Sequence, residues 1–477
     1  MKIAIIPIDN RPVCYSLPRK IAAIDSSIEL FLPEKTDMGS LKRQANIDGI
    51  INWLKGLGKI DALIVALDTI AYGGLVSSRR SKDSFEEIEA RLKKFKKVLH
   101  KETQVYAFSS IMRISNNNFN EEEKPYWDKY GKKIFEYSYN FHKELIDETD
   151  VPKDIIVDYL NTRRRNFNVN KIYEKWFEKG IFNTLVYSKD DCSPYGFNVM
   201  EADILSRDLR RKSKNGKCAL IKTGADEIPL SLFARAVVDY NVKLGNKAPK
   251  IEIEYLEPGH KHLISNYEDI SVEECTEGQI LLTNCEITED KDDADMQLIV
   301  NNFEEQQGEL VMGIDTKKYS GEFKLPEKIF MIADIRFTNG ADSRFVRKLL
   351  KNNLTSNFYG YSAWNTTANT LGSLLCVGLV RYFAQNYNQN AFNTIQFIRF
   401  LDDWAYQSKV RQALKKQVQR PNLKTLKKLM TPYEKKLKKI FNIEKEIKYS
   451  FPWKRFFEIE ILFRNRLWRF LIFLYLP

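Results

Sequence analysis

Two adjacent carboxylates, Asp190 and Asp191, stand at the end of a short apolar run and are followed by a turn at residues 193–196. Neighbouring acids repel each other, so a chain keeps them together on a solvated surface, at a metal ion, or where one of them holds a proton. The turn allows both side chains to face one pocket, although neighbours in an extended strand point in opposite directions. A catalytic pair, a structural acid pair and a metal site stay open, and the pair is our first choice for chemistry.

Other strand-like segments also end in polar residues, which is how α/β enzymes build their sites. Asp9 and Arg11, with Asp68, form a candidate clamp for a polar substrate, and a turn locked by Asp–Arg hydrogen bonds explains them equally well. Gly73 and Gly74 allow backbone amides to approach an anion, but no complete phosphate-loop motif is present. The candidate substrate-binding residues are Asp9, Asn10, Arg11, Asp68, Tyr72, Gly73, Gly74, Arg79, Arg113, Asp226, Glu227, Asp334, Asn339, Asp342, Trp364, Asn365 and Asn369.

Several of these candidates have good structural explanations as well. Arginines such as Arg79 and Arg113 form structural ion pairs more often than they bind ligands. Asp226 and Glu227 precede a predicted helix, where acids cap the helix and complement its dipole, or alternatively act as a base or hold a sugar hydroxyl. The later cluster around Trp364 offers acids, amides and an aromatic face that suit a carbohydrate, or it is a buried tryptophan beside a helix cap.

The four histidines do not support a serine–histidine–aspartate arrangement. His100 and His142 lie on predicted helical surfaces, and His260 and His262 follow a Pro-Gly turn, where a loop explains them better than a metal site. We therefore expect neither a metal nor a cofactor, and carboxylates would have to carry any catalysis. That chemistry favours glycoside hydrolysis over acyl transfer.

The aspartate pair is similar to one found in the substrate-assisted N-acetylhexosaminidases of the O-GlcNAcase and hyaluronidase type. The resemblance implies that one aspartate orients the acetamide that acts as nucleophile, while its neighbour is the general acid. It extends over two residues only. Lys189, directly before the pair, can form an ion pair with one carboxylate, which would weaken a catalytic role.

The net charge of +12 on the 477 residues is concentrated at one end. Residues 407–477 hold 19 lysines and arginines against 5 acids, so the body of the chain is nearly neutral and does not predict specific nucleic-acid binding. The aromatic end of this basic region either docks on the body or contacts a membrane surface or a polyanion. It contains Trp453, Phe456, Phe457, Phe463, Trp468 and Phe470.

The cysteines, the N-terminal segment and the apolar runs of the chain bear on the expected cellular location. Six cysteines lie far apart, without a CxxC pair or a Cys/His cluster, which indicates reduced, mostly buried thiols. The N-terminal segment lacks the long apolar core and cleavage site of a signal peptide, and no apolar run reaches the roughly 20 residues of a membrane helix. We expect a cytoplasmic protein whose partner is a small-molecule or oligosaccharide substrate, with the oligomeric state open.

Strand-like and helical segments alternate over residues 1–385, which predicts an α/β fold with mostly parallel strands. The strand count fits two α/β units or a (β/α)8-like barrel, and the linker-like residues 245–249 favour two units. We expect a first unit at 1–245 with a helical insertion at about 116–180, a second unit at 246–390, and a helical, basic C-terminal region at 391–477 that packs on the body.

Motifs spread along the chain resemble the bacterial family known as domain of unknown function 4127. The resemblance implies a shared fold over essentially the whole chain and no settled activity. The matching segments are IPIDNRP at 6–12, LDTIAYGGLVSSR at 67–79, IMR at 111–113, SKDD at 188–191, GADE at 224–227, NGAD at 339–342, WNTTANTLG at 364–372, LDDW at 401–404, PW at 452–453 and FE at 457–458.

The leading functional hypothesis is a cofactor-independent hydrolase that acts on a carbohydrate through Asp190 and Asp191. The alternative is a non-catalytic binding protein for an anionic sugar or a cell-envelope polymer, which would use Arg11, Arg79, Arg113 and Trp364. Both hypotheses require that the carboxylates at the strand ends face a common cleft. These are Asp9, Asp68, Asp190, Asp191, Asp226 and Asp334.

Overall fold

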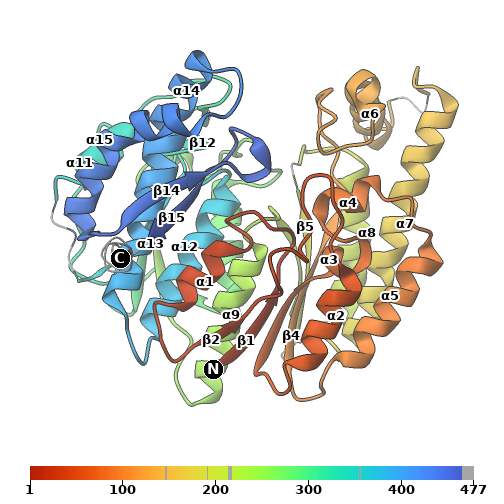
Figure 1. Cartoon of the computed structure of the whole chain (residues 1–477), viewed down its shortest axis with the longest axis horizontal. Coiled ribbons are helices and arrows are strands. Elements are labelled where there is room, and N and C mark those ends of the chain that lie inside the picture. Colours follow the sequence, from red (N-terminus) through yellow and green to blue (C-terminus); the bar gives the residue numbers. More distant parts are fainter. Residues whose placement is uncertain (146–147, 191, 213–217, 353, 355, 465–477) are drawn as a thin grey trace, which may run out of the picture.

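Six strands from the first half of the chain form one parallel sheet, the frame of the first unit (Figure 1). The computed structural model describes residues 1–145, 148–190, 192–212, 218–352, 354 and 356–464. Strand β3 is buried along its whole length because helices cover both faces of a parallel sheet. In sheet order the strands are β2 (Glu29–Phe31), β1 (Lys2–Ile6), β3 (Ala62–Ala66), β4 (Gln104–Ile111), β5 (Thr184–Lys189) and β6 (Cys218–Thr223), and each neighbouring pair is parallel.

Helices lie on both faces of this sheet, and two short helices follow β3 directly. Figure 1 shows α1 (Ser16–Ala22) and α9 (Ile228–Lys243) on the side that faces the second unit. The short helices are α3 (Leu67–Tyr72) and α4 (Leu75–Arg80). The opposite face carries α2 (Ile47–Gly56), α5 (Phe85–Val98), α7 (Lys153–Glu178) and α8 (Phe197–Lys212).

The region expected as a helical insertion contains α6 (Trp127–His142) and the 26-residue helix α7. These helices bury a small apolar cluster of their own, in which Trp127 and Tyr159 lie with their ring centroids 5.8 Å apart. The segment between β4 and α6 is thereby held beside the carboxyl end of the first sheet.

A second parallel sheet forms the frame of the second unit, with helix α12 (Thr367–Tyr382) packed against α9 of the first unit. The short parallel pair β10 (Gly308–Glu309) and β12 (Phe337–Thr338) lies in the connections of this unit. The predicted α/β class with mostly parallel strands is confirmed, and the described strands form two large parallel sheets and two two-stranded sheets. The second sheet runs β13 (Phe358–Ser362), β11 (Phe330–Asp334), β9 (Met296–Asn301), β7 (Lys250–Tyr255) and β8 (Glu286–Ile287), with α10 (Val272–Leu282) and α11 (Ser343–Leu349) as further helices.

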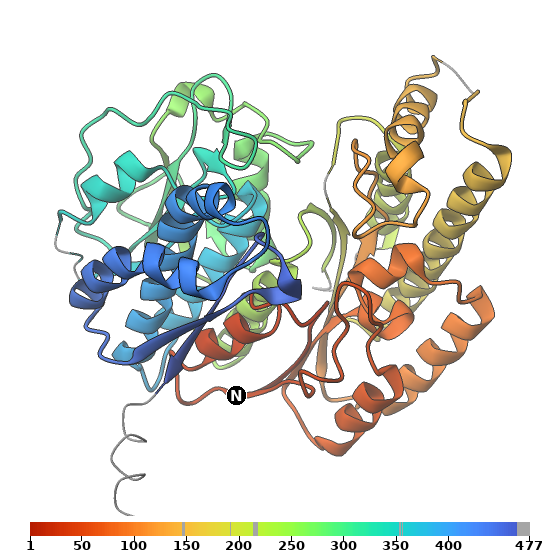
Figure 2. The same ribbon diagram turned by 45° about the horizontal axis from the view of Figure 1, so that its top comes forward.

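The C-terminal region is mainly helical, as expected, but it ends in an antiparallel hairpin that the sequence did not predict. Strand β14 alternates exposed and buried side chains, the period-2 pattern of a half-buried strand. Figure 2 shows the tip of the hairpin beside the N-terminal segment. Among the described residues, no helix has the length and apolar character to cross a bilayer. The elements are α13 (Gln389–Arg399), a π-helix (Phe400–Val410), α14 (Arg411–Gln417), α15 (Leu423–Phe441), β14 (Glu446–Ser450) and β15 (Glu460–Arg464).

Gly73, between α3 and α4, allows a close approach that no other residue tolerates. Its φ is +82°, and a Cβ there would lie 2.8 Å from the backbone nitrogen of Ala45. We expect Gly73→Ala to lower the free energy of unfolding by about 1–3 kcal/mol in urea titrations. Gly56→Ala, at the end of α2 where a Cβ meets nothing within 4 Å, is expected to be neutral or stabilising by up to about 1 kcal/mol. Equal effects of the two substitutions would contradict this explanation.

Candidate functional site

A cleft of about 370 Å³ opens where the carboxyl end of the first sheet faces loops of the second unit and the tip of the C-terminal hairpin. Open α/β sheets bind their ligands at this edge. Six of the sequence-predicted residues line it, namely Arg11, Arg113, Asp190, Asp226, Asn339 and Asn365. The rest of the lining is Leu75, Val76, Asn117, Phe119, Glu121, Glu122, Tyr267, Trp453, Arg455 and Phe457.

Arg11 lies at the base of the cleft, in the turn after β1. Its Nε donates to Asp9 Oδ2 at 2.8 Å, and its two terminal nitrogens donate to the two oxygens of Asp226, one of them at 2.9 Å. Burial acts to lower the pKa of Arg11, but Asp226 and Asp9 together raise that pKa above its usual value. The turn is thus locked by Asp–Arg hydrogen bonds, and it is also tied to the end of β6, 215 positions along the chain.

Trp453 brings the C-terminal region into the cleft. Its Nε1 donates to Asn10 Oδ1 at 2.8 Å, and its ring centroid lies 5.0 Å from Arg11 Cζ and 4.8 Å from Arg455 Cζ. A cation over an indole ring is attracted by the electrons of the ring face. The φ of Trp453 is 52°, a strained value for this residue type, so the hairpin tip is held in place by these contacts.

A cluster of alternating charges forms the opposite wall. Glu122 Oε2 accepts from Arg79 at 3.2 Å and from Arg113 at 3.0 Å, and its Oε1 accepts from Arg455 at 2.7 Å. Asp190 Oδ2 lies 3.4 Å from a terminal nitrogen of each of Arg79 and Arg113. Burial acts to raise the pKa of Glu122, but Arg113, Arg79 and Arg455 hold that pKa well below its usual range. Arg79 and Arg113 therefore form ion pairs, and they orient Asp190 at the cleft.

The two carboxylates of the cleft differ in their surroundings. Burial raises the pKa of Asp226 to about 6; Arg11 opposes this shift, and the charges of Asp9 and Asp190 add to it. Asp190 is partly exposed beside its two arginines. Lys189 bonds to Asp269 and not to this acid, so the lysine does not neutralise Asp190. Asp191 lies outside the described residues.

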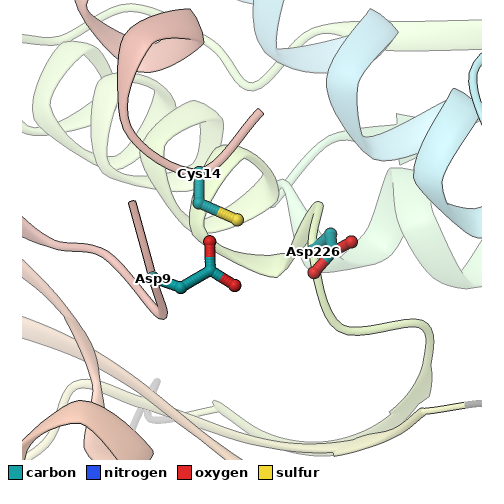
Figure 3. Close-up of side chains that lie close together, drawn as sticks. All are labelled: Asp9, Cys14 and Asp226. Atoms are coloured by element: carbon teal, nitrogen blue, oxygen red, sulfur yellow. The ribbon is translucent and has the colours of Figure 1, made fainter. Parts of the chain in front are cut away.

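Figure 3 shows the trio Asp9, Cys14 and Asp226, whose ligand atoms lie within 4.8 Å of one another. Both carboxylates already bind the guanidinium of Arg11. Burial, with the charges of Asp9 and Asp226, raises the pKa of the Cys14 thiol well above its usual value. A metal ion would have to displace Arg11 and deprotonate this thiol, so the donor set fits the guanidinium of Arg11 better than a metal ion.

Four predicted residues after β3 lie behind the cleft wall. Asp68 is buried, and its Oδ2 accepts the Ser110 N–H at 2.8 Å. Tyr72 is buried beneath the guanidinium of Arg165. The amides of Gly73 and Gly74 donate to carbonyls of α3 at 3.0 and 3.1 Å, so neither N–H points to an anion in this structure.

Several predicted residues from later in the chain also lie away from the cleft. Asp334 accepts from Asn301 and Tyr361, and Asp342 caps α11. Glu227 is buried at the start of α9, where its Oε1 accepts from Gln279 at 3.2 Å. These side chains stabilise the loops that surround the site and do not line it. The expectation that all the strand-end carboxylates face one cleft is therefore met only in part, by Asp190 and Asp226. Trp364 and Asn369 are buried too.

Four lining residues that were not predicted as site residues come from two runs that are typical of a protein surface. Glu121 and Glu122 belong to an acidic run before α6, and such a run is usually solvated. Trp453 and Phe457 belong to the aromatic C-terminal segment and line the cleft. Phe456 and Phe457 also pack against the hydrophobic core. Glu122 is revealed by its ion pairs with Arg79 and Arg113, and Trp453 by its contact with Arg11. Glu121 and Phe457 are revealed by their contacts with Arg455. Trp468 and Phe470 lie outside the described residues, so membrane contact there stays a prediction.

The buried carboxyl of Asp68 predicts a pH dependence of stability. Burial raises its pKa to about 7, although the hydrogen bond from Ser110 acts to lower that pKa. An unfolded aspartate loses its proton near pH 4, so over pH 4–7 the folded protein keeps a proton that the unfolded chain loses, and stability falls as pH rises by about 1.4 kcal/mol per unit. In Asp68→Asn this contribution is absent. We expect urea midpoints measured between pH 4.5 and 7 to decline less steeply in the variant, and parallel declines would refute the assignment.

Comparison with known proteins bears out the family resemblance of the motifs. A family model described as a protein of unknown function (DUF4127) matches residues 3–462. No curated protein and no solved structure matches the chain. Because the family model spans nearly the whole sequence, the chain belongs to the DUF4127 family.

Proposed function

We propose that the protein is a carbohydrate-active hydrolase that works by carboxylate chemistry in this cleft. The observation that carries the proposal is the meeting of Asp190 and Asp226, which follow the neighbouring strands β5 and β6, in one cleft lined by amides and aromatic rings. Sugar rings stack on aromatic faces and sugar hydroxyls pair with amides and carboxylates, so this lining suits a carbohydrate.

The charges of the cleft favour a neutral sugar over an anionic one. Arg11 forms an ion pair with Asp9, and Arg79, Arg113 and Arg455 each form one with Glu122. An anionic ligand would have to break these pairs and bring a further negative charge beside Asp190 and the glutamates. The alternative of a non-catalytic protein for anionic sugars therefore has less support, because its expected ligands are engaged.

The two carboxylates suit different roles. Asp226, with a pKa raised to about 6, keeps a proton to higher pH than an ordinary aspartate, as a general acid for the leaving group requires. Asp190, ion-paired with two arginines, suits the anionic partner that stabilises the developing positive charge or orients the nucleophile. Asp191 stays a sequence-based candidate to share that second role.

The acid assignment predicts the effect of Asp226→Asn on a panel of 4-nitrophenyl glycosides, including N-acetylated sugars. We expect kcat to fall by roughly 10²–10⁴-fold, because the variant has no proton to donate. Asp9→Asn also weakens the pairing of Arg11 but leaves the acid in place, so its loss of activity is expected to be at least about tenfold smaller. Similar losses in the two variants would show that Asp226 acts only through Arg11.

The same assignment predicts a pH profile. The active form of Asp226 is protonated, so kcat/KM of the wild type is expected to fall as pH rises through about 6. Asp190→Asn and Asp191→Asn, assayed on the same glycosides, test whether these aspartates act as the anionic partner that stabilises the positive charge or orients the nucleophile. If calorimetry detects sugar binding but no glycoside is hydrolysed, the hydrolase proposal is wrong and the protein is a binding protein.

A further inference from the structure

Two asparagines form one wall of the cleft from two separate loops. Asn339 follows β12 and Asn365 follows β13, with φ values of 62° and 61°. This left-handed conformation is one that asparagine tolerates better than most residues. The N–H of Asn339 donates to the carbonyl of Asn365 at 2.8 Å, so the two loops are joined at the cleft. Asn339 Nδ2 also donates to Glu309 Oε1 at 2.7 Å, which fixes the orientation of its amide.

Both loops are attached to one residue of the π-helix, Asp403. Its Oδ2 accepts the N–H of Ala363 at 2.8 Å, and its backbone carbonyl accepts the N–H of Ala341 at 3.1 Å. These alanines lie two positions from Asn365 and Asn339. One fully buried residue thus holds both loops next to the amides that face the cleft.

The local backbone is shaped to permit this attachment. Gly340 has φ +143°, and a Cβ there would lie 3.0 Å from the carbonyl oxygen of Asp403 and 2.8 Å from Ser408 Oγ. Ser408 in turn donates to the carbonyl of Ala341 at 2.9 Å. The wide turn of a π-helix is a feature that recurs at functional sites. Arg399, one turn earlier, lies 3.4 Å from Asp403 and balances its charge.

We propose that Asp403 is a positioning residue that holds Asn339 and Asn365 in the geometry that binds hydroxyls of a neutral sugar. Asp403 does not reach the cleft; it acts through the two loops. The inference rests on the proposed function and deepens it, since it assigns substrate affinity to the second-unit wall and bond cleavage to Asp190 and Asp226.

The first test measures kinetics of the full-length chain on a hydrolysed 4-nitrophenyl glycoside. Asp403→Ala leaves the Ala363 N–H unpaired, and we expect KM to rise about tenfold, the equivalent of one lost hydrogen-bonding contact, with kcat changed less than about threefold. Asp403→Asn keeps an acceptor oxygen and is expected to restore KM to within about threefold. A fall in kcat with unchanged KM in Asp403→Ala would overturn the inference.

Asp402→Ala is the matched control, because it removes a buried aspartate from the same helix. Asp402 faces Arg399 at 3.8 Å and Gln407 at 3.5 Å, and it bonds to neither loop. We expect this variant to lose comparable stability with its KM unchanged. An equal rise of KM in both variants would mean that the π-helix acts only through general stability, which overturns the positioning role.

The second test does not depend on turnover. Amide hydrogen exchange, followed by mass spectrometry of the full-length chain, is expected to accelerate at least about tenfold in peptides that contain Ala363 when Asp403 is replaced by alanine, because the Ala363 N–H loses its acceptor. Exchange at Ala341 is expected to change less, because its acceptor is the backbone carbonyl that the variant keeps, and Asp402→Ala is expected to leave both at the wild-type rate. Unchanged exchange in Asp403→Ala overturns the inference whichever way the glycosides behave. Accelerated exchange without wild-type turnover of any glycoside leaves the attachment standing and removes the hydrolase proposal.

Discussion

The site depends on the ion pairs of one buried arginine. Arg11 joins the turn after β1 to the end of β6 through Asp9 and Asp226, and its outer side meets the ring of Trp453 from the C-terminal hairpin. A buried guanidinium is tolerated only when its N–H groups are paired, so these three parts of the chain must come together for any of them to be stable. The same pairing raises the pKa of Arg11 and sets the field in which Asp226 titrates.

The surrounding wall repeats this arrangement with different partners. Arg79, Arg113 and Arg455 share Glu122, while Asp190 binds the first two of these arginines. Pairing on this scale leaves the cleft polar without a surplus of positive charge. That balance is the reason for placing a neutral, hydroxyl-rich ligand there. The second unit contributes amides, and the π-helix holds their loops.

Much of the fold was predictable because backbone hydrogen bonding and burial leave strong local signals. The continuous apolar runs at β1, β3 and β4 predicted strands of a parallel sheet, and the alternation with helices predicted the α/β class. The β14–β15 hairpin was missed because its alternation of polar and apolar residues is short and lies within a lysine-rich, helix-like stretch. Candidate site residues were found by their place at strand ends. That rule selects the right edge of the sheet but not the direction of a side chain, so Asp190 and Asp226 reach the cleft whereas Asp68 and Asp334 face the interior.

By itself the sequence determined the family, the α/β class and the set of polar residues from which a site could be built. Each of these depends on local pattern or on motifs that are contiguous in the chain. The tertiary structure decided which of those residues meet. Trp453 lies 443 positions from its partner Asn10, and Glu122 gains its role only because β3, β4 and the hairpin tip converge on it. Contacts between distant segments are set by the packing of whole layers, and no local pattern encodes them.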